Sequence, residues 1–304
     1  LELDECGVCD GDGSYCDGTQ FVPSEFATIQ SAIDASVDED EVIVSAGTYY
    51  ENINYNGKNI SITGEDRETT IIDGSNNGRV ITFDGDNSYP IILSGFTITN
   101  GNSDHGGGIY IKDGLNINLS NLIITGNVSL EYGWTHDVGG GAKIYSSTGN
   151  ISNVILSDNE AESWGGGLYV KYSDLTLQGV DFYNNTGGNS SGGAFFESSN
   201  VDIYNSVVAG NHTHYNGAGF QFRSGDYNLT NVTIANNTTH CNNCMNGRGG
   251  AILQNGSTVT LINSIIWDNF ASSQIKFEGS TPSTLNISYS DVYGGQDNIN
   301  WLVD

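Results

Sequence analysis

Basic residues, proline, methionine and long apolar runs are all scarce in this sequence. Of 304 residues only nine are Lys or Arg, against 36 Asp or Glu, so the formal net charge is -27. A nucleic-acid backbone would be repelled by such a chain, because no basic cluster in the sequence relieves the repulsion. No stretch approaches the roughly 18 apolar residues of a membrane-spanning helix. The sequence therefore excludes nucleic acid as a partner and a transmembrane segment.

Disorder is also excluded, although the chain is strongly acidic. Only 15% of the residues are charged, and 37% are hydrophobic. Because the apolar residues are spread evenly along the chain, a sizeable core can form.

The chain repeats with a period near 26 residues. Gly groups such as G-G-G-I-Y-I at 106–111 and G-G-G-L-Y-V at 165–170 recur, and the first apolar residues after them are separated by 33, 26, 26, 26 and 31 positions. A second column of asparagines follows the same period, with steps of 32, 26, 26, 26 and 32. Its members are Asn127, Asn159, Asn185, Asn211, Asn237 and Asn269. Such periodicity is typical of solenoids.

The segments between these columns are short, alternating and β-branched, as in 199–208 and 259–267. Strands that recur once per coil pair in parallel with the same strand of the next coil, so the sequence predicts an all-β parallel β-helix of about nine coils. Asparagine tolerates left-handed turn conformations and can hydrogen-bond its neighbours above and below. We therefore interpret the asparagine column as a structural ladder inside a turn.

An amphipathic helix is expected before the first coil. In 28–37, Ile29, Ala32, Ile33 and Val37 share one helical face, and Thr28 can serve as N-cap. Such a helix would cover the open apolar end of the solenoid. The predicted organisation is an acidic Cys-rich segment at 1–20, the capping helix at 21–40 and the β-helix at 41–304.

The five cysteines form two groups. Cys6, Cys9 and Cys16 lie near the start, and Cys241 and Cys244 form a C-x-x-C pair far away. This distribution favours local disulfides in an oxidising compartment, between Cys241 and Cys244 and between two of the first three, with one thiol left over. Zinc is the competing interpretation of the C-x-x-C pair, but no His stands at finger spacing.

Several of these segments resemble known families. A-T-I-Q-S-A-I-D, E-V-I-V-S-A-G-T-Y-Y-E-N-I and G-K-N-I-S-I-T-G resemble the N-terminal cap and first coils of secreted bacterial right-handed β-helix proteins of the pectin-lyase-like superfamily. The G-G-A-I type motif with F-Y-N-N is similar to the repeats of chlamydial polymorphic outer membrane proteins. The resemblance implies a right-handed β-helix and an extracellular or cell-surface location, but no single activity.

The opening D-E-C-G-V-C-D-G-D-G-S-Y-C-D-G resembles thrombospondin type 3-like calcium segments. The resemblance implies calcium as a cofactor, because side-chain oxygens at alternating positions suit a hard cation. The candidate ligands are Asp10, Asp12, Ser14 and Asp17. An acidic linker is the alternative interpretation.

The first functional hypothesis is a noncatalytic extracellular β-solenoid that acts as a stalk, adhesin or matrix protein. It would associate with itself end to end or with other surface proteins. Its basis is the uniform coils and the missing catalytic motifs of the superfamily, whose lyases use an Arg or Lys beside a calcium cluster. The basic residues are scattered singly in the sequence, and Arg223 is the one on a clear coil strand.

The alternative is a polysaccharide-active enzyme or a carbohydrate-binding face. Aligned on the Gly groups, Asp104 and Asp137 fall in one column and Glu162 in a neighbouring one. Carboxylates one or two coils apart would be about 5 or 10 Å apart, the separations used in retaining and inverting glycoside cleavage. The candidate sugar contacts nearby are Tyr132, Trp134, His136 and Trp164.

Overall fold

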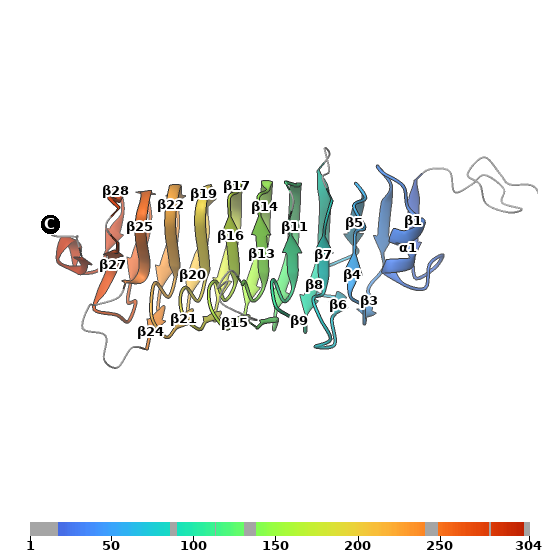
Figure 1. Cartoon of the computed structure of the whole chain (residues 1–304), viewed down its shortest axis with the longest axis horizontal. Coiled ribbons are helices and arrows are strands. Elements are labelled where there is room, and N and C mark those ends of the chain that lie inside the picture. Colours follow the sequence, from blue (N-terminus) through green and yellow to red (C-terminus); the bar gives the residue numbers. More distant parts are fainter. Residues whose placement is uncertain are drawn as a thin grey trace, which may run out of the picture.

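The chain folds into an elongated rod of stacked coils. The computed structural model describes residues 18–85, 90–112, 114–130, 138–240, 249–279 and 281–300. Strands follow one another along the rod from the N-terminal to the C-terminal end (Figure 1). Each pairs in parallel with the equivalent strand of the adjacent coils. The prediction of a right-handed parallel β-helix is confirmed.

Three columns of strands run the length of the rod. The first column contains β4 (Ile53–Asn54), β7 (Ile81–Phe83), β10 (Ile109–Ile111), β13 (Ala142–Tyr145), β16 (Leu168–Lys171), the first parts of β19 (Ala194–Tyr204), β22 (Phe220–Thr230) and β25 (Gly249–Ile262), then β27 (Ser273–Phe277) and β30 (Ile299–Asn300). The second contains β1 (Thr19–Val22), β2 (Glu41–Val44), β5 (Ser61–Gly64), β8 (Ile91–Thr99), β11 (Asn116–Thr125), β14 (Thr148–Ser157), β17 (Asp174–Tyr183), the second parts of β19, β22 and β25, and β28 (Thr284–Ser288).

The third column contains β3 (Gly47–Tyr49), β6 (Thr70–Asp73), the ends of β8, β11, β14 and β17, and β20 (Val207–Ala209), β23 (Thr233–Ala235), β26 (Ile265–Trp267) and β29 (Asp291–Val292). A separate small sheet lies at one corner: β9 (Asn102–Ser103), β12 (Val128–Ser129), β15 (Glu160–Ala161), β18 (Thr186–Gly187), β21 (His212–Thr213) and β24 (Thr238–Thr239).

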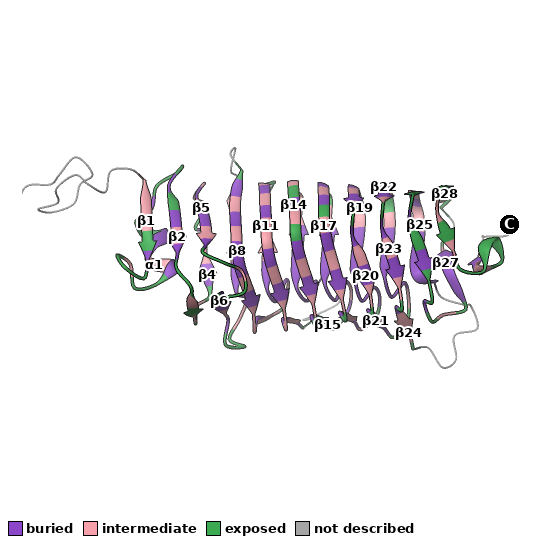
Figure 2. Cartoon of the chain, turned by 180° about the vertical axis from the view of Figure 1, so that it is seen from behind, coloured by how far each residue is buried: buried purple, intermediate pink, exposed green. Residues whose placement is uncertain are grey.

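The core lies inside the coils, because alternate residues of each strand point inward. In the first column Ile109 is in register with Ala142, Ala142 with Leu168, and Leu168 with Ala194, which are the repeat steps found in the sequence. All four are at most 2% exposed. Figure 2 shows buried and less buried residues alternating along the strands. Burial of each large apolar side chain contributes about 1.5–3 kcal/mol.

The asparagine column forms a buried ladder next to this core. Asn127 donates from its backbone N–H and its Nδ2 to Oδ1 of Asn159, at 3.1 and 3.0 Å. The same pair of bonds joins Asn159 to Asn185 and continues coil by coil to Asn269. There Asn269 donates from Nδ2 to Oε1 of Gln274 at 2.8 Å. Polar turn atoms that water cannot reach are thereby satisfied.

Glycine columns allow the coils to pack closely beside the ladder. A Cβ added at Gly141 would lie 2.6 Å from the carbonyl oxygen of Gly167, and one at Gly167 would lie 2.7 Å from that of Gly193. Any side chain there would force the coils apart. The recurrent Gly groups are therefore required by the close approach of successive backbones.

The N-terminal end of the solenoid is covered by α1 (Ile29–Ala35). Ile29, Ala32 and Ile33 are fully buried, but the helix ends before Val37, which is 66% exposed. The Glu51 carboxylate accepts hydrogen bonds from the first helical N–H groups, of Ile29 and Gln30, both at 2.9 Å. In the described part of the chain, no helix has the length and apolar character needed to cross a bilayer.

The C-terminal coils are less covered. After β29 the chain forms a short 3-10 helix at Gly295–Asn298. Trp267 and Tyr293 pack edge to face at 4.9 Å and remain 42% and 44% exposed, and Tyr289 is 91% exposed.

Candidate functional site

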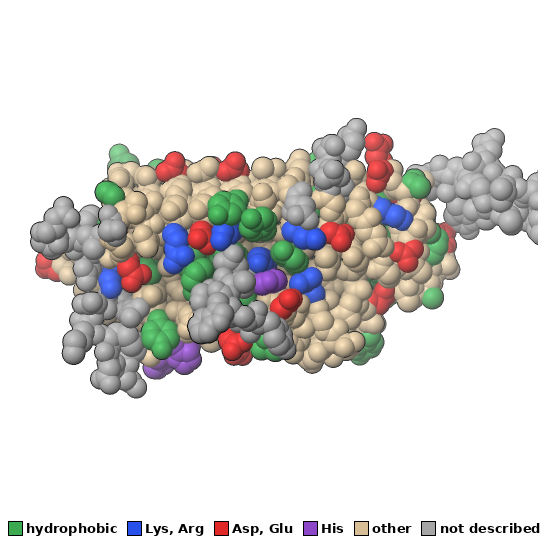
Figure 3. Space-filling view, in the orientation of Figure 1, with side chains coloured by type: hydrophobic (Ala, Val, Ile, Leu, Met, Phe, Trp, Pro, Cys, Tyr) green, Lys and Arg blue, Asp and Glu red, His purple; other side chains and the backbone are tan. Residues whose placement is uncertain are grey.

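Six of the nine basic residues lie in or next to the first column. They are Arg79 before β7, Lys112 after β10, Lys143 in β13, Lys171 in β16, Arg223 in β22 and Lys276 in β27. Neighbouring members are 28 to 53 residues apart in the sequence, but each coil of about 26 residues returns the chain to the same face. Figure 3 shows blue Lys and Arg side chains along one face of the rod, and Lys143 and Lys276 are only 5% and 8% exposed. We call this outward surface the cationic face.

Aromatic rings lie beside and between these cations along the rod. Outward-pointing Tyr110, Lys143, Tyr169 and Phe195 are consecutive partners in the first column. The Arg79 guanidinium lies 4.6 Å from the centre of the Tyr110 ring. The Lys143 ammonium lies between two rings, 5.4 Å from Tyr110 and 5.8 Å from Tyr169. Each such contact contributes about 0.5–2 kcal/mol, more where water is excluded.

The series continues to Trp164 and Arg223. The Trp164 and Phe195 rings are stacked with an angle of 6° and a centroid distance of 4.8 Å. The Arg223 guanidinium lies 4.8 Å from the Trp164 ring and 5.2 Å from the Phe195 ring. These contacts restrict the guanidinium, so part of the entropy cost of holding it for a ligand has already been met.

Glu197 is the anionic centre of this part of the face. Its Oε2 accepts a hydrogen bond from the Tyr169 hydroxyl at 2.6 Å and lies 3.3 Å from the Lys171 ammonium. Its Oε1 lies 3.6 Å from Nη1 of Arg223. The Glu197 side chain is only 15% exposed, so these interactions are less screened than surface ion pairs. Glu197 therefore orients Lys171 and Arg223.

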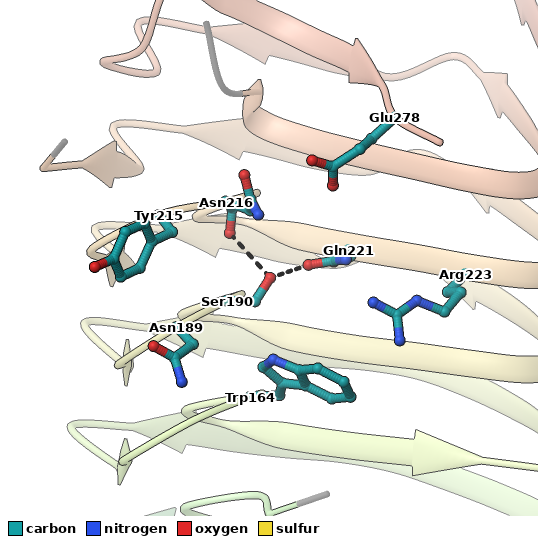
Figure 4. Close-up of a pocket in the computed structure, with 8 residues that line it drawn as sticks. All are labelled: Trp164, Asn189, Ser190, Tyr215, Asn216, Gln221, Arg223 and Glu278. Atoms are coloured by element: carbon teal, nitrogen blue, oxygen red, sulfur yellow. Dashed lines mark hydrogen bonds between the residues drawn. The ribbon is translucent and has the colours of Figure 1, made fainter. Parts of the chain in front are cut away.

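A cavity of about 360 Å³ opens between the small sheet and the cationic face. Its lining residues are Trp164, Asn189, Ser190, Tyr215, Asn216, Gln221, Arg223 and Glu278. Figure 4 shows Trp164 and Arg223 below Glu278, with Tyr215 at the opposite end. Ser190 donates from Oγ to Oε1 of Gln221 and to the carbonyl oxygen of Asn216. Side chains from four coils thus surround one cavity.

The lining chemistry suits a sugar. An indole offers a flat apolar surface for a pyranose ring, and amide and hydroxyl groups can hydrogen-bond its hydroxyls. The Arg223 guanidinium can bind a carboxylate or sulfate through two parallel N–H groups. Its side chain is 31% exposed, which leaves part of it accessible to a ligand.

Hydrolytic chemistry has less support from the described residues. Glycoside hydrolysis normally needs two carboxyl groups across the scissile bond. Among the described residues that line the cavity, Glu278 is the one carboxylate. Glu197 is nearby, but it is occupied by Tyr169, Lys171 and Arg223. The second carboxyl group that hydrolysis would need is not among the described residues that line this cavity.

Two of the predicted catalytic carboxylates lie at the corner with the small sheet. Ser103 and Ala161 are both in register with Ser129, so Asp104 and Glu162 stand at the same level two coils apart. The sequence alignment had put them in neighbouring columns. Two residues separate the small strand from its Gly group after Ser103, but three do after Ala161, so counting back from glycine was wrong by one position. Asp137 lies outside the described residues.

Asp104 interacts with the cationic face. Its Oδ1 lies 3.5 Å from Nη2 of Arg79, and the side chain is 52% exposed. Arg79 is held more firmly by the carbonyl oxygens of His105 and Gly106, at 2.8 and 3.1 Å from Nε. Burial lowers the pKa of Arg79, and the charges of Asp104 and Tyr110 oppose that shift. Asp104 therefore acts as a counter-ion, while Glu162 is exposed.

Of the four predicted sugar contacts, Trp164 lines the cavity. Tyr132, Trp134 and His136 lie outside the described residues. The same is true of the calcium candidates Asp10, Asp12, Ser14 and Asp17 and of all five cysteines. These assignments remain predictions.

Sequence reasoning missed most of the cavity. Tyr215, Gln221 and Glu278 were not singled out, and Arg223 was noted only as an isolated basic residue. One signal was available: Tyr110, Lys143, Tyr169, Phe195 and Gln221 all stand two positions after the last Gly of their glycine-rich groups. Extending the repeat alignment by one column past the buried position would have found the three rings and Lys143 in one row.

A different cavity, of about 470 Å³, lies on the outward face of the second column. It is lined by Asp174, Leu175, Thr176, Asn200, Asp202, Asp226 and Asn228. Side chains of adjacent coils are hydrogen-bonded to one another on this surface. Asn200 donates to Asp174 and Asn228 donates to Asp202, both at 2.8 Å. We call this surface the amide face.

Comparisons with known proteins identify the fold. No family model and no curated protein matches the sequence. Among solved structures, the enzymatically active domain of bacteriophage CBA120 tailspike protein 2 matches with a TM-score of 0.54 and 12% identity, over 90% of this chain and 43% of that one. This likeness shows the fold alone. The chain spans less than half the length of the tailspike domain.

Two further structures match less closely. An alginate lyase from Paenibacillus sp. has a TM-score of 0.38 and 13% identity, over 90% of this chain and 96% of the lyase. The pectin methylesterase from Aspergillus niger has a TM-score of 0.29 and 12% identity, over 95% and 91%. These structures are pectin-lyase-like parallel β-helix proteins.

Proposed function

We propose that this chain is an extracellular β-helix that binds an acidic polysaccharide along the cationic face, with Trp164 and Arg223 at the centre of the site. The observation that carries the proposal is the alignment of six of nine basic residues on one face, interleaved with aromatic rings. A rod with a continuous face suits an extended polymer better than a small molecule.

The choice of an anionic ligand depends on the balance between local and total charge. The whole chain carries -27 and repels anions at long range. At physiological salt the Debye length is about 8 Å, so distant carboxylates are largely screened. Within that range of the cavity the ligand meets Arg223, with Lys171 as its neighbour through Glu197. Glu197 and Glu278 bring two negative charges into the same region, so the attraction comes from the directed contact of the Arg223 guanidinium rather than from an excess of local positive charge.

Binding without cleavage is favoured because a single carboxylate lines the described cavity, as noted above. The tailspike domain of similar fold is described as enzymatically active. Cleavage therefore has to be measured in the same samples as binding. A noncatalytic role agrees with the hypothesis of a surface or matrix protein, in which the rod would attach to a charged glycan.

The test compares a polyuronate oligosaccharide with a neutral glucan of matched length, using calorimetric titration of the full chain. We expect saturable binding of the acidic oligosaccharide alone. Its affinity should fall at least about tenfold in Arg223→Gln, and it should fall when salt is raised. New reducing ends and unsaturated products should not appear.

The matched control is Arg67→Gln. Arg67 lies away from the cationic face, where Nη1 donates to the Asn153 carbonyl at 3.1 Å. Arg67→Gln removes the same charge as Arg223→Gln, and the affinity of this variant for the acidic oligosaccharide should stay within about twofold of the parent. Equal binding of neutral and acidic oligosaccharides, or equal losses in both variants, would contradict the proposal. If new reducing ends or unsaturated products appeared, the proposed function would be cleavage of the polysaccharide instead of binding.

A further inference from the structure

Three of the five histidines meet at one corner of the rod. His212 begins β21, His214 lies two residues later, and His240 directly follows β24 in the next coil. Thr213 is in register with Thr239, so His240 stands at the level of His214. Side chains two positions apart on a strand point the same way, which puts His212 and His214 on one side. Figure 3 shows a purple histidine patch at the lower edge of the rod.

The three imidazole rings are close together. The ring centres of His212 and His240 are 4.6 Å apart, and those of His212 and His214 are 5.5 Å apart. The Nδ1 atoms of His212 and His240 face each other at 3.3 Å. One nitrogen could donate a proton to the other, or both could bind one ion.

The nitrogen separation matches a shared metal ion. Tetrahedral zinc has Zn–N bonds of about 2.0–2.1 Å, which places two ligand nitrogens about 3.3–3.4 Å apart.

We propose that His212, His214 and His240 form a binding site for a borderline divalent transition-metal ion such as Zn²⁺ or Cu²⁺. Nδ1 of His212 and Nδ1 of His240 already have the separation of two ligands of one ion. His214 supplies the third by turning toward them. Within the described residues no three His, Cys, Asp or Glu side chains are already arranged around one ion, so this turn is required. His214 is exposed, and exposed side chains change rotamer within nanoseconds.

Imidazole nitrogen selects the class of metal. Ca²⁺ and Mg²⁺ prefer oxygen ligands, whereas Zn²⁺, Cu²⁺ and Ni²⁺ accept imidazole. Three protein ligands leave a fourth position for water or another group. Tyr215, which follows His214, lines the cavity of about 360 Å³, but none of the three histidines is among its lining residues. The metal site does not depend on the proposed glycan binding.

The experiment titrates Zn²⁺ and Cu²⁺ into the full chain carrying Cys241→Ser and Cys244→Ser, so that these two thiols contribute no ligand. We expect one ion per chain in calorimetry, and the visible spectrum of four-coordinate Co²⁺ when cobalt is used. His212→Ala, His214→Ala and His240→Ala should each lower the affinity at least about tenfold. The control is His105→Ala, which removes a histidine elsewhere and should change the affinity less than about twofold.

A second measurement guards against loss of folding in a variant. Saturating Zn²⁺ should raise the melting temperature of the parent and of His105→Ala but not of the triple histidine variant. Absence of saturable binding by the parent would overturn the proposal. So would an affinity that is unchanged in His240→Ala, since the two rings would then be only a hydrogen-bonded pair.

Discussion

The cationic face and the amide face are built on the same coils but differ in chemistry. On the amide face, Asp174, Asn200 and Asp226 follow one another in register, and short polar side chains satisfy each other along the rod. On the cationic face, long cationic and aromatic side chains contact one another, and Lys143 is only 5% exposed.

The difference shows that the spacing of the coils does not determine the chemistry of the surface. A parallel β-helix places equivalent residues of successive coils about 4.8 Å apart, whatever they are. Asn and Asp side chains are short enough to hydrogen-bond directly to the Asp or Asn at the equivalent position of the next coil. Lysine, arginine and aromatic side chains reach further and contact side chains of other columns and other coils. Function therefore lies in the side-chain columns rather than in the fold.

The largest expected effect concerns the scaffold that both faces share. Asn211→Ala should lower the free energy of unfolding by about 3 kcal/mol, because it leaves the buried N–H of Asn185 and the carbonyl oxygen of Phe182 without their partner. Chemical denaturation measures the change. The control Asn200→Ala removes an exposed amide of the amide face and should cost less than about 1 kcal/mol. Similar costs for both would mean that the buried ladder is no more important than the surface rows.

A smaller effect distinguishes the two faces directly. Glu197→Gln should lower the free energy of unfolding by about 2 kcal/mol, because Lys171 and Arg223 lose a partly buried anionic partner. Asp202→Asn on the amide face also removes one negative charge. It should cost less than about 1 kcal/mol, since Asp202 receives a single surface bond from Asn228. Denaturation of both variants in parallel tests this, and a larger cost for Asp202→Asn would reverse the comparison.

The smallest effect depends on pH and comes from the histidine corner formed by His212, His214 and His240. The described residues that line the amide face include no histidine. The pKa of His212 is lowered in the folded chain, so the unfolded chain binds the proton more readily. The corresponding stability is present above the unfolded pKa of about 6.5 and is lost as pH falls toward the folded pKa.

Melting temperatures of the parent and His212→Gln between about pH 5.5 and 7.5 measure this contribution. The parent should lose stability on acidification more steeply than the variant, while both share the titration of the carboxylates. Parallel curves would show that His212 does not contribute.

The features that could be predicted from the sequence are those whose residues recur with the coil period or form a local pattern. The parallel β-helix was predictable because Ile109, Ala142 and Leu168 recur at coil spacing, and buried positions tolerate few residue types. The N-terminal helix was predictable from its apolar face. The prediction carried the helix too far, to Val37, whereas the helix ends at Ala35. Trp164 was singled out, but its stacking on Phe195 and its contact with Arg223 were not, because these residues come from three different coils.

The sequence by itself determined the coil, its period and the residues that must face inward, since hydrophobic alternation and turn chemistry are local properties. Only the tertiary structure decided the site. Six basic residues that are scattered singly along an acidic chain become one face, and histidines 28 residues apart bring two ring nitrogens within 3.3 Å. The physical reason is that parallel stacking turns a separation of one coil in the sequence into a distance of about 5 Å in space.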